Sequence, residues 1–175
     1  MEVIITEENK KEESMINPKR NSKNTRDFIK INKKKLTVLD NYKQLGELSN
    51  IVITCVGDDY DLKNIFFGKK GIIYGLKKKT LLIDHTTCSE KISKQIHSRC
   101  LKKKCYFFDA PMSGGEIGAK EGKLSLMVGG SQKKFNDLKK ITKYYSKSCI
   151  YMGSSGSGQL TKLVNQIFEI GRAHV

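Results

Sequence analysis

The stretch IVITCVGDD at residues 51–59 decides the class of fold. It opens with a short continuous apolar run that stops at Gly57-Asp58-Asp59, which is the pattern of a strand buried in a parallel sheet. The same pattern recurs along the chain at residues 81–84, 105–109, 124–128 and 149–152. We therefore expect a series of short strands that belong to one sheet.

Helical stretches separate these strands. Residues 89–104 and 131–146 have helical spacing, which in the second stretch relates Phe135, Leu138, Ile141, Thr142 and Tyr145. Alternation of strand and helix indicates crossover units, a mostly parallel sheet and helices on its faces, which is the doubly wound α/β class. Ligands of such sheets bind at the carboxyl ends of the strands, and here three predicted strand ends are polar, at 57–59, 84–87 and 109–115.

The glycine motif that usually opens a dinucleotide-binding sheet does not occur in this sequence. That motif, G-x-G-x-x-G, lets a pyrophosphate approach the start of a helix. The glycine-rich stretch Gly153–Gly158 has the spacing G-x-x-G-x-G and lacks the Lys-Ser/Thr of a phosphate-binding loop, so we do not interpret it as a nucleotide loop. The predicted fold is therefore an incomplete Rossmann-type sheet that lacks the first strand and its glycine-rich loop.

Composition limits the classes of protein to which this chain can belong. The formal net charge is +15, but the lysines form short runs along the whole chain, at 33–35, 77–79 and 102–104 among others, so we expect a solvated surface and not a nucleic-acid site. The five cysteines include no C-x-x-C pair, which favours a reduced, intracellular protein. No apolar stretch approaches the roughly 20 residues that span a bilayer, and so we expect no membrane partner. We expect a cytoplasmic protein, with the mitochondrion as the alternative.

Two motifs carry the candidate chemistry. In DAPMSGG, residues 109–115, a hydroxyl at Ser113 precedes two glycines whose backbone N–H groups can approach an anion such as a carboxylate, although a tight turn explains the same residues. In GSGQLTKLVNQ, residues 156–166, Lys162 lies on one helix face with Asn165 and Gln166. A lysine near a helix start can act as acid and base, although the spacing alone favours a solvated surface lysine.

Taken together, DAPMSGGEIGAKEGKLSLMVGG at 109–130 and GSSGSGQLTKLVNQ at 153–166 resemble the β-hydroxyacid dehydrogenase family. This family includes 3-hydroxyisobutyrate dehydrogenase and tartronate semialdehyde reductase and has a cofactor domain of the 6-phosphogluconate dehydrogenase type. TCVGDD at 54–59 and IDHTT at 83–87 resemble two further strand ends of the family that contact cofactor. The resemblance covers about residues 47–168.

The resemblance implies an oxidoreductase that uses NAD or NADP and transfers hydride between nicotinamide and a small 3-hydroxy acid or its semialdehyde. It implies that Lys162 moves the proton of the substrate hydroxyl. The implied substrate-binding residues are Ser113, Gly114, Gly115, Asn165 and Gln166, and the implied cofactor-binding residues are Val56, Gly57 and Thr87. Two positions depart from the family: Gly57 replaces a common proline, and Gln166 replaces a second asparagine. His85 is interpreted as a turn residue on the cofactor side and not as a base.

The resemblance also divides the chain. Residues 1–46 form a charged, weakly structured segment, in which Val3-Ile4-Ile5 is a possible remnant of the second strand; residues 47–153 form the later part of the cofactor domain, and residues 154–168 begin an interdomain helix. Residues 169–175, EIGRAHV, resemble the translation of a sequencing adapter.

Two hypotheses follow from this division. In the first, the chain is a truncated piece of a dehydrogenase that is homo-oligomeric at full length, and the piece alone has little activity. In the second, it is a basic, catalytically incompetent module that binds a polyanion or a protein partner.

Overall fold

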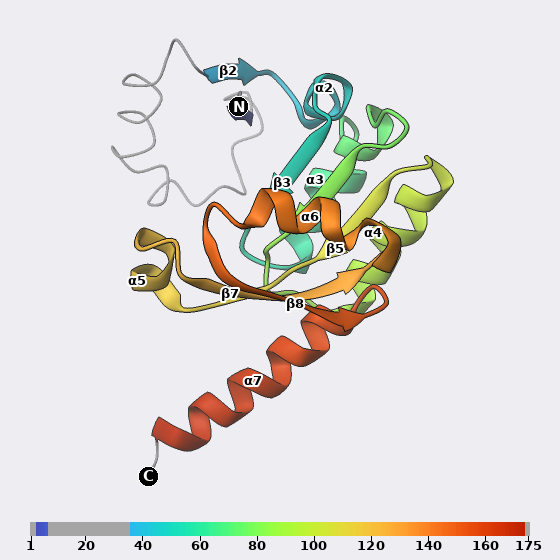
Figure 1. The fold of residues 1–175 in the computed structure, drawn as a ribbon. Coiled ribbons are helices and arrows are strands. Elements are labelled where there is room, and N and C mark those ends of the chain that lie inside the picture. The colour runs from blue at the N-terminus through green and yellow to red at the C-terminus, as the bar shows by residue number, and fades with distance from the viewer. Residues whose placement is uncertain (1–2, 7–35, 174–175) are drawn as a thin grey trace.

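The computed structural model describes residues 3–6 and 36–173 (Figure 1). The strands are β1 (Val3–Thr6), β2 (Leu36–Leu39), β3 (Ile51–Thr54), β4 (Leu81–Asp84), β5 (Tyr106–Asp109), β6 (Met112–Ser113), β7 (Leu124–Gly130) and β8 (Ser146–Gly153). The helices are α2 (Tyr42–Leu48), α3 (Asp59–Phe67), α4 (Glu90–Lys102), α5 (Gly115–Lys120), α6 (Phe135–Thr142) and α7 (Ser157–Ala173). Short 3-10 turns occupy Ile72–Tyr74 and Gln132–Lys134.

The main sheet is mixed, with parallel pairing at both ends. Strands β3, β4 and β5 are parallel neighbours, and β8 pairs parallel to β7. Strand β7 runs antiparallel to β5 and to the short β6, which pair with different parts of β7. The predicted α/β fold with a mostly parallel sheet is confirmed, and its one reversal is at β7.

The strand residues alternate between two hydrophobic cores, one on each face of the sheet. In β4, Leu82 points to the first core, where Phe66 and Phe107 pack edge to face with ring centroids 6.1 Å apart. Leu81 and Ile83 point to the second core, which they share with residues of β5, β7 and α6. Helices α3 and α4 supply the first core and α6 the second, so the sheet has helices on both faces (Figure 1).

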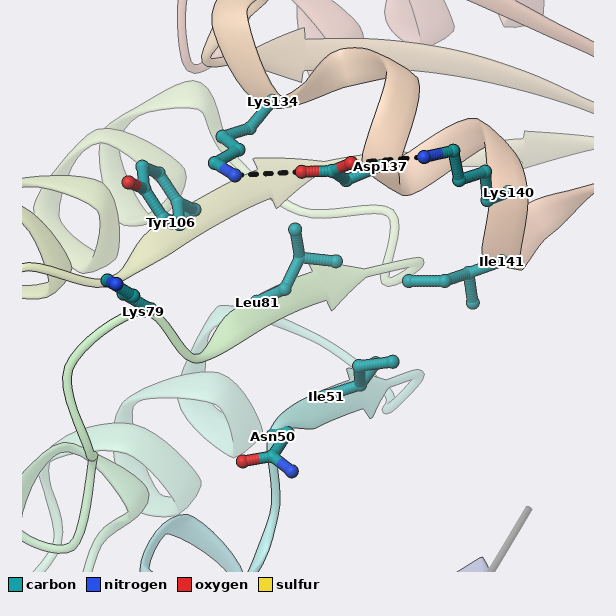
Figure 2. A pocket seen from close by; sticks show the side chains of 9 residues that line it. All are labelled: Asn50, Ile51, Lys79, Leu81, Tyr106, Lys134, Asp137, Lys140 and Ile141. Carbon is teal, nitrogen blue, oxygen red and sulfur yellow. Dashed lines mark hydrogen bonds and ion pairs between the residues drawn. The ribbon is translucent and has the colours of Figure 1, made fainter.

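Strand β3 departs from the predicted buried strand. Its burial alternates: Val52 is 2% exposed, whereas Ile51 and Ile53 are 44% and 47% exposed. The prediction of a strand buried on both faces was wrong because no element of the described chain covers the second face of the sheet at β3. Figure 2 shows the resulting open groove, in which Ile51 and Leu81 form the floor and α6 forms one wall.

The first predicted helix, 89–104, agrees with the structure at its start, whereas the second, predicted from 131, begins with a 3-10 turn and becomes α-helical at Phe135. Ser89 caps α4, because its side chain accepts a hydrogen bond from the amide of Ile92. The second predicted helix, 131–146, was too long: α6 ends at Thr142, and Ser146 begins β8 opposite Leu124. Helical spacing continues to Tyr145 because a turn after α6 still directs that side chain toward the sheet, where it contacts His85.

Two strands and a helix lie in the described part of the N-terminal segment. Strands β1 and β2 pair in parallel in a separate two-stranded sheet, and residues 7–35 of the same predicted segment lie outside the described residues. Helix α2 spans the predicted boundary between residues 46 and 47. It is held close to the 3-10 turn at 72–74, since a Cβ at Gly46 would lie 2.6 Å from the carbonyl oxygen of Ile72.

All five cysteines are free, and no helix within the described ranges has both the length and the apolar character to cross a membrane.

Substitutions at two adjacent positions in β3 test whether one face of this strand is buried and the other exposed. Val52→Thr should lower the free energy of unfolding by about 1–3 kcal/mol, because it places a hydroxyl in the first core without a partner. Ile53→Thr should change it by less than about 0.5–1 kcal/mol, because the side chain already faces solvent and remains β-branched. Urea unfolding of both variants measures the difference, and equal costs would contradict the exposed second face.

Candidate functional site

Three strand ends predicted to carry chemistry lie side by side. Thr54, Asp84 and Asp109, the last residues of β3, β4 and β5, are aligned by the parallel register. Asp84 and Asp109 are fully buried. Their carboxylates accept hydrogen bonds from the surrounding protein.

The carboxylate of Asp109 binds the start of α7. One oxygen accepts a hydrogen bond from the amide of Gly156 at 2.7 Å, and the other accepts one from the amide of Gln159 at 3.2 Å. Glycine is required beside this contact, since a Cβ at Gly129 would lie 2.7 Å from both carboxylate oxygens. Burial raises the pKa of Asp109, and the amide hydrogen bonds oppose that rise. The glycine-rich stretch 153–158 therefore uses its amides on Asp109, which agrees with its not being a nucleotide loop.

Asp84 organises the neighbouring loop. Its Oδ1 accepts hydrogen bonds from the Thr54 hydroxyl at 2.8 Å and from the amide of Thr86 at 3.2 Å. The hydroxyl of Thr86 in turn accepts one from the amide of Val56 at 3.0 Å. Burial raises the pKa of Asp84 to about 6, although these hydrogen bonds lower it, because a charged carboxylate loses its hydration in this position.

The three predicted cofactor-binding residues lie on the two loops that leave β3 and β4. Gly57 and Thr87 are exposed, and Val56 is half-buried. The amide of Gly57 binds the carboxylate of Asp61 at 3.0 Å, which shapes the loop as it enters α3. The exposed surface of these loops can accept the ribose and nicotinamide side of a dinucleotide, whereas no glycine-rich cradle for its pyrophosphate occurs in the sequence.

Lys162 lies in the second turn of α7 and is only 8% exposed. Lysine is rarely buried without a partner. No hydrogen bond or ion pair joins the Lys162 amine to another residue in the part of the chain that the structure describes. This position is therefore unlike that of a solvated surface lysine, which was the competing interpretation of the sequence.

Ser113 and Asn165 meet at one carboxylate oxygen. The hydroxyl of Ser113, in β6, donates to Oε1 of Glu169 at 3.2 Å, and the side-chain amide of Asn165 donates to the same atom at 3.0 Å. Glu169 belongs to the stretch that resembles an adapter translation, and the structure continues α7 through it to Ala173.

The other predicted substrate residues flank this point. Gly114 and Gly115 follow Ser113 with φ angles of 124° and 57°, which only glycine adopts readily, and they begin α5. Gln166 follows Asn165 on α7 and is half-buried. The tight turn and the anion cradle, which the sequence left as alternatives, are therefore compatible.

His85 and Cys88 are excluded as reactive groups. Nδ1 of His85 lies 2.7 Å from the carbonyl oxygen of Ala110, and Nε2 lies 2.9 Å from the hydroxyl of Tyr145, so both ring nitrogens have partners. Burial lowers the pKa of this histidine, which keeps it neutral. It lies in the loop directly after β4, where its side chain bridges Ala110 and Tyr145, which agrees with the expectation that it is not a base. Burial also raises the pKa of the Cys88 thiol to about 12, so the nucleophilic thiolate does not form near neutral pH.

Sequence reasoning missed Thr86 and Gln159. Thr86 is 1% exposed and joins the loops after β3 and β4, and Gln159 is 3% exposed and joins α7 to the loop after β4. Both have ordinary polar side chains, and their partners lie 30 and 73 residues away along the chain. The only sequence signal was their position beside a strand end and a helix start.

Comparisons with known proteins agree with this arrangement. Residues 4–153 match the model of the family described as the NAD binding domain of 6-phosphogluconate dehydrogenase. The chain is 41% identical over 128 residues to an uncharacterized oxidoreductase of Shewanella frigidimarina, covering 73% of this chain and 44% of the relative. It is 34% identical over 125 residues to 2-hydroxy-3-oxopropionate reductase of Escherichia coli, covering 71% of this chain and 43% of the relative.

Solved structures show the same fold. Mycobacterium tuberculosis 3-hydroxyisobutyrate dehydrogenase, determined with L-serine, superposes with a TM-score of 0.69 at 24% identity, covering 74% of this chain and 44% of that one. The chain thus spans less than half the length of the curated relatives described above. The family match confirms the predicted resemblance and the predicted NAD-type cofactor, and it favours the oxidoreductase hypothesis over the polyanion-binding module.

Asp84 should make stability depend on pH. Its pKa rises from 3.8 in the unfolded chain to about 6 in the folded protein, so the folded state stays protonated to a higher pH. The free energy of unfolding should therefore fall by about 3 kcal/mol as pH rises from 4 to above 6 and then level off. Asp84→Asn retains an oxygen for Thr54 and Thr86 and should remove this part of the slope. Urea unfolding from pH 4 to 8 tests this, and parallel profiles for the two proteins would refute it.

Proposed function

We propose that this chain, which belongs to the family of the NAD binding domain of 6-phosphogluconate dehydrogenase, is part of an NAD(P)-dependent oxidoreductase acting on a small 3-hydroxy acid or its semialdehyde. The proposal rests on one observation: Ser113 and Asn165 both donate hydrogen bonds to one carboxylate oxygen, that of Glu169. Glu169 lies on α7, the helix that also contains the buried Lys162. A carboxylate site beside a buried amine suits a hydroxy acid better than a neutral alcohol.

The carboxylate of the substrate would take the place of the Glu169 carboxylate. Ser113 and Asn165 would each donate one hydrogen bond to it, as each does to Glu169, and a charge-assisted bond of this kind contributes about 1.5–3 kcal/mol. The amides of Gly114 and Gly115 would add further donors, and Gln166 would orient the rest of the molecule. Two hydrogen bonds to one carboxylate oxygen would fix that end of the substrate in position, and the further contacts would have to fix its rotation for aligned transfer.

Lys162 would move the proton of the substrate hydroxyl. It lies one helical turn before Asn165, so it shares that side of α7 with the residue that would hold the carboxylate. In oxidation the neutral amine would accept the hydroxyl proton as the carbonyl forms, and in reduction the ammonium would return it to the carbonyl oxygen. Burial with no competing ion pair among the described residues leaves the amine available for that exchange.

The nicotinamide dinucleotide would supply or accept the hydride. Val56, Gly57 and Thr87 would line its ribose and nicotinamide, since their loops leave neighbouring parallel strands at the carboxyl edge of the sheet. The residues present therefore fit one end of the cofactor. Its pyrophosphate requires a glycine-rich loop other than 153–158, whose amides bind Asp109.

The remaining proposals concern the whole protein. Along α7 a series of large apolar side chains is exposed, and the helix projects from the sheet (Figure 1): Leu160, Leu163, Val164, Ile167, Phe168 and Ile170. Such a face supports packing against further protein, in line with the expected homo-oligomer. The expected cytoplasmic location, with the mitochondrion as its alternative, stays a prediction.

Substitution of Lys162 should separate chemistry from binding. In the full-length protein, Lys162→Ala should lower kcat for oxidation of a 3-hydroxy acid by about 10²–10⁴-fold, the usual contribution of a general acid–base group, and leave cofactor binding nearly unchanged. Lys147→Ala, at an exposed position in β8, serves as the matched control. Steady-state rates and cofactor fluorescence titration measure both effects. Normal turnover by the Lys162 variant would remove it from the reaction, and saturable turnover by the present chain alone would contradict its expected inactivity.

Substitution of Ser113 should act on binding. Ser113→Ala in the full-length protein should raise the KM for the hydroxy acid by about tenfold, the loss of one charge-assisted hydrogen bond, with a small effect on kcat. An analogue with an amide in place of the carboxylate should show little change in KM between the two proteins. The proposed carboxylate site would be wrong if the KM for the acid did not move.

A further inference from the structure

We propose that Gln159 is a positioning residue, which fixes the cofactor-side loop at Thr87 against the helix that carries Lys162. The inference rests on the proposed function, because Gln159 would link the loop proposed to bind the cofactor to the helix proposed to supply the acid–base group. No motif of the sequence analysis included Gln159 among the site residues. The structure joins it to both sides of the site.

The side chain of Gln159 binds the loop on both sides of Thr87. Its Nε2 donates to the carbonyl oxygen of Thr86 at 2.7 Å, and its Oε1 accepts from the amide of Cys88 at 3.1 Å. The side-chain amide therefore pairs with the backbone as a neighbouring strand would. It fixes the backbone around Thr87 and leaves that residue exposed toward the cofactor side.

The backbone at Gln159 is itself fixed. Its amide donates to the carboxylate of Asp109, which also binds the amide of Gly156. The preceding residue must be glycine, since a Cβ at Gly158 would lie 2.7 Å from the carbonyl oxygen of Asp109 and 2.8 Å from one of its carboxylate oxygens. The first turn of α7 is thus clamped against β5, and Gln159 extends that rigid connection to the loop after β4.

Lys162 lies three residues beyond Gln159, on the same side of α7. A short path of packed and hydrogen-bonded groups therefore runs from Thr87 through Gln159 to the Lys162 backbone. In the proposed reaction the nicotinamide would lie against Thr87 while Lys162 would reach the substrate hydroxyl. The side chain of Gln159 then sets the distance between the hydride position and the proton position, and an error of about 1 Å in such an alignment can cost about 10²-fold in rate.

A purely structural role makes a different prediction. If Gln159 only supported the fold, its loss would lower stability and reduce the amount of active enzyme, without changing the chemical step. If it positions the loop, its loss should free the loop locally and slow hydride transfer at saturating substrate. Hydrogen exchange and kinetic isotope effects distinguish the two.

The experiment uses Gln159→Met, which keeps the length of the side chain and removes both hydrogen bonds, and Gln159→Glu, which keeps an acceptor for the Cys88 amide and loses the donor to Thr86. Thr161→Val is the matched control, because it removes a hydrogen bond within α7, from the Thr161 hydroxyl to the carbonyl oxygen of Ser157 at 2.8 Å, that does not touch the loop.

The first measurement needs no activity and uses the present chain. Amide hydrogen exchange at Cys88 should become at least about tenfold faster in Gln159→Met, less so in Gln159→Glu, and remain unchanged in Thr161→Val, since the amide loses its acceptor only in the first. Unchanged exchange at Cys88 in Gln159→Met would overturn the proposal. An equal acceleration throughout the domain would also overturn it, because that result indicates general destabilisation.

The second measurement uses the full-length protein. Gln159→Met should lower kcat by about 10²-fold and enlarge the deuterium isotope effect on hydride transfer, while the KM for the hydroxy acid stays within about threefold. A kcat equal to that of Thr161→Val would overturn the positioning role. If the unsubstituted full-length protein oxidises no hydroxy acid, the proposed function fails, and the exchange result still decides whether Gln159 fixes the loop.

Discussion

The carboxylate of Asp109, fully buried at the end of β5, binds two backbone amides at the start of α7. This contact determines where α7 begins and in which direction it leaves the sheet. Lys162 and Asn165 are placed by the helix, so their positions follow from the contact. A buried carboxylate is costly unless it is hydrogen-bonded, and here the unpaired amides of a helix start offset that cost while the helix dipole favours the negative charge.

A second buried carboxylate, that of Asp84, fixes the loops after β3 and β4 by hydrogen bonds. Asp84 holds Thr54 and the amide of Thr86, and Thr86 holds Val56. Its pKa near 6 indicates that burial outweighs these hydrogen bonds at neutral pH. The ionised form of Asp84 is therefore less stable in the folded protein than in water, despite its hydrogen bonds. Functional sites commonly show this compromise, because fixed polar groups orient loops that an apolar edge would leave free.

The sequence predicted the architecture better than the site. Apolar runs located the strands of the main sheet, because burial in the sheet requires them. The same reasoning failed at Ile51 and Ile53, since an apolar run cannot show that, among the described residues, no helix covers one face of the edge strand β3. Resemblance to a family predicts Lys162, Ser113 and Asn165 as site residues, whereas spacing alone left each as an ordinary surface or turn residue.

Polar residues at strand ends were interpreted as groups that bind a ligand. In the structure some of these residues are buried and others are exposed. Asp84 and Asp109 are buried and bind protein, whereas Gly57 and Thr87 nearby are exposed. Local sequence cannot predict this division, because it depends on partners far along the chain. The link between Gln159 and Thr86 spans 73 residues and became visible only when α7 was placed beside the loop.

The two sides of the site are not held equally. The Lys162 side lies on a helix that is clamped to the central strand β5 by Asp109. The cofactor side begins at Val56, after the edge strand β3, whose second face is open to solvent. Val56 is joined to the better-fixed part of the site through the Thr86 hydroxyl, and Thr86 is joined to α7 through Gln159. In the proposed site, the position of the cofactor relative to Lys162 would therefore depend on the hydrogen bonds of the loop after β4 as well as on the sheet. A protein segment that packs against the open face of β3 would bury the rest of Ile51 and Ile53, which are 44% and 47% exposed, and would gain for each about half of the roughly 1.5–3 kcal/mol of a full burial.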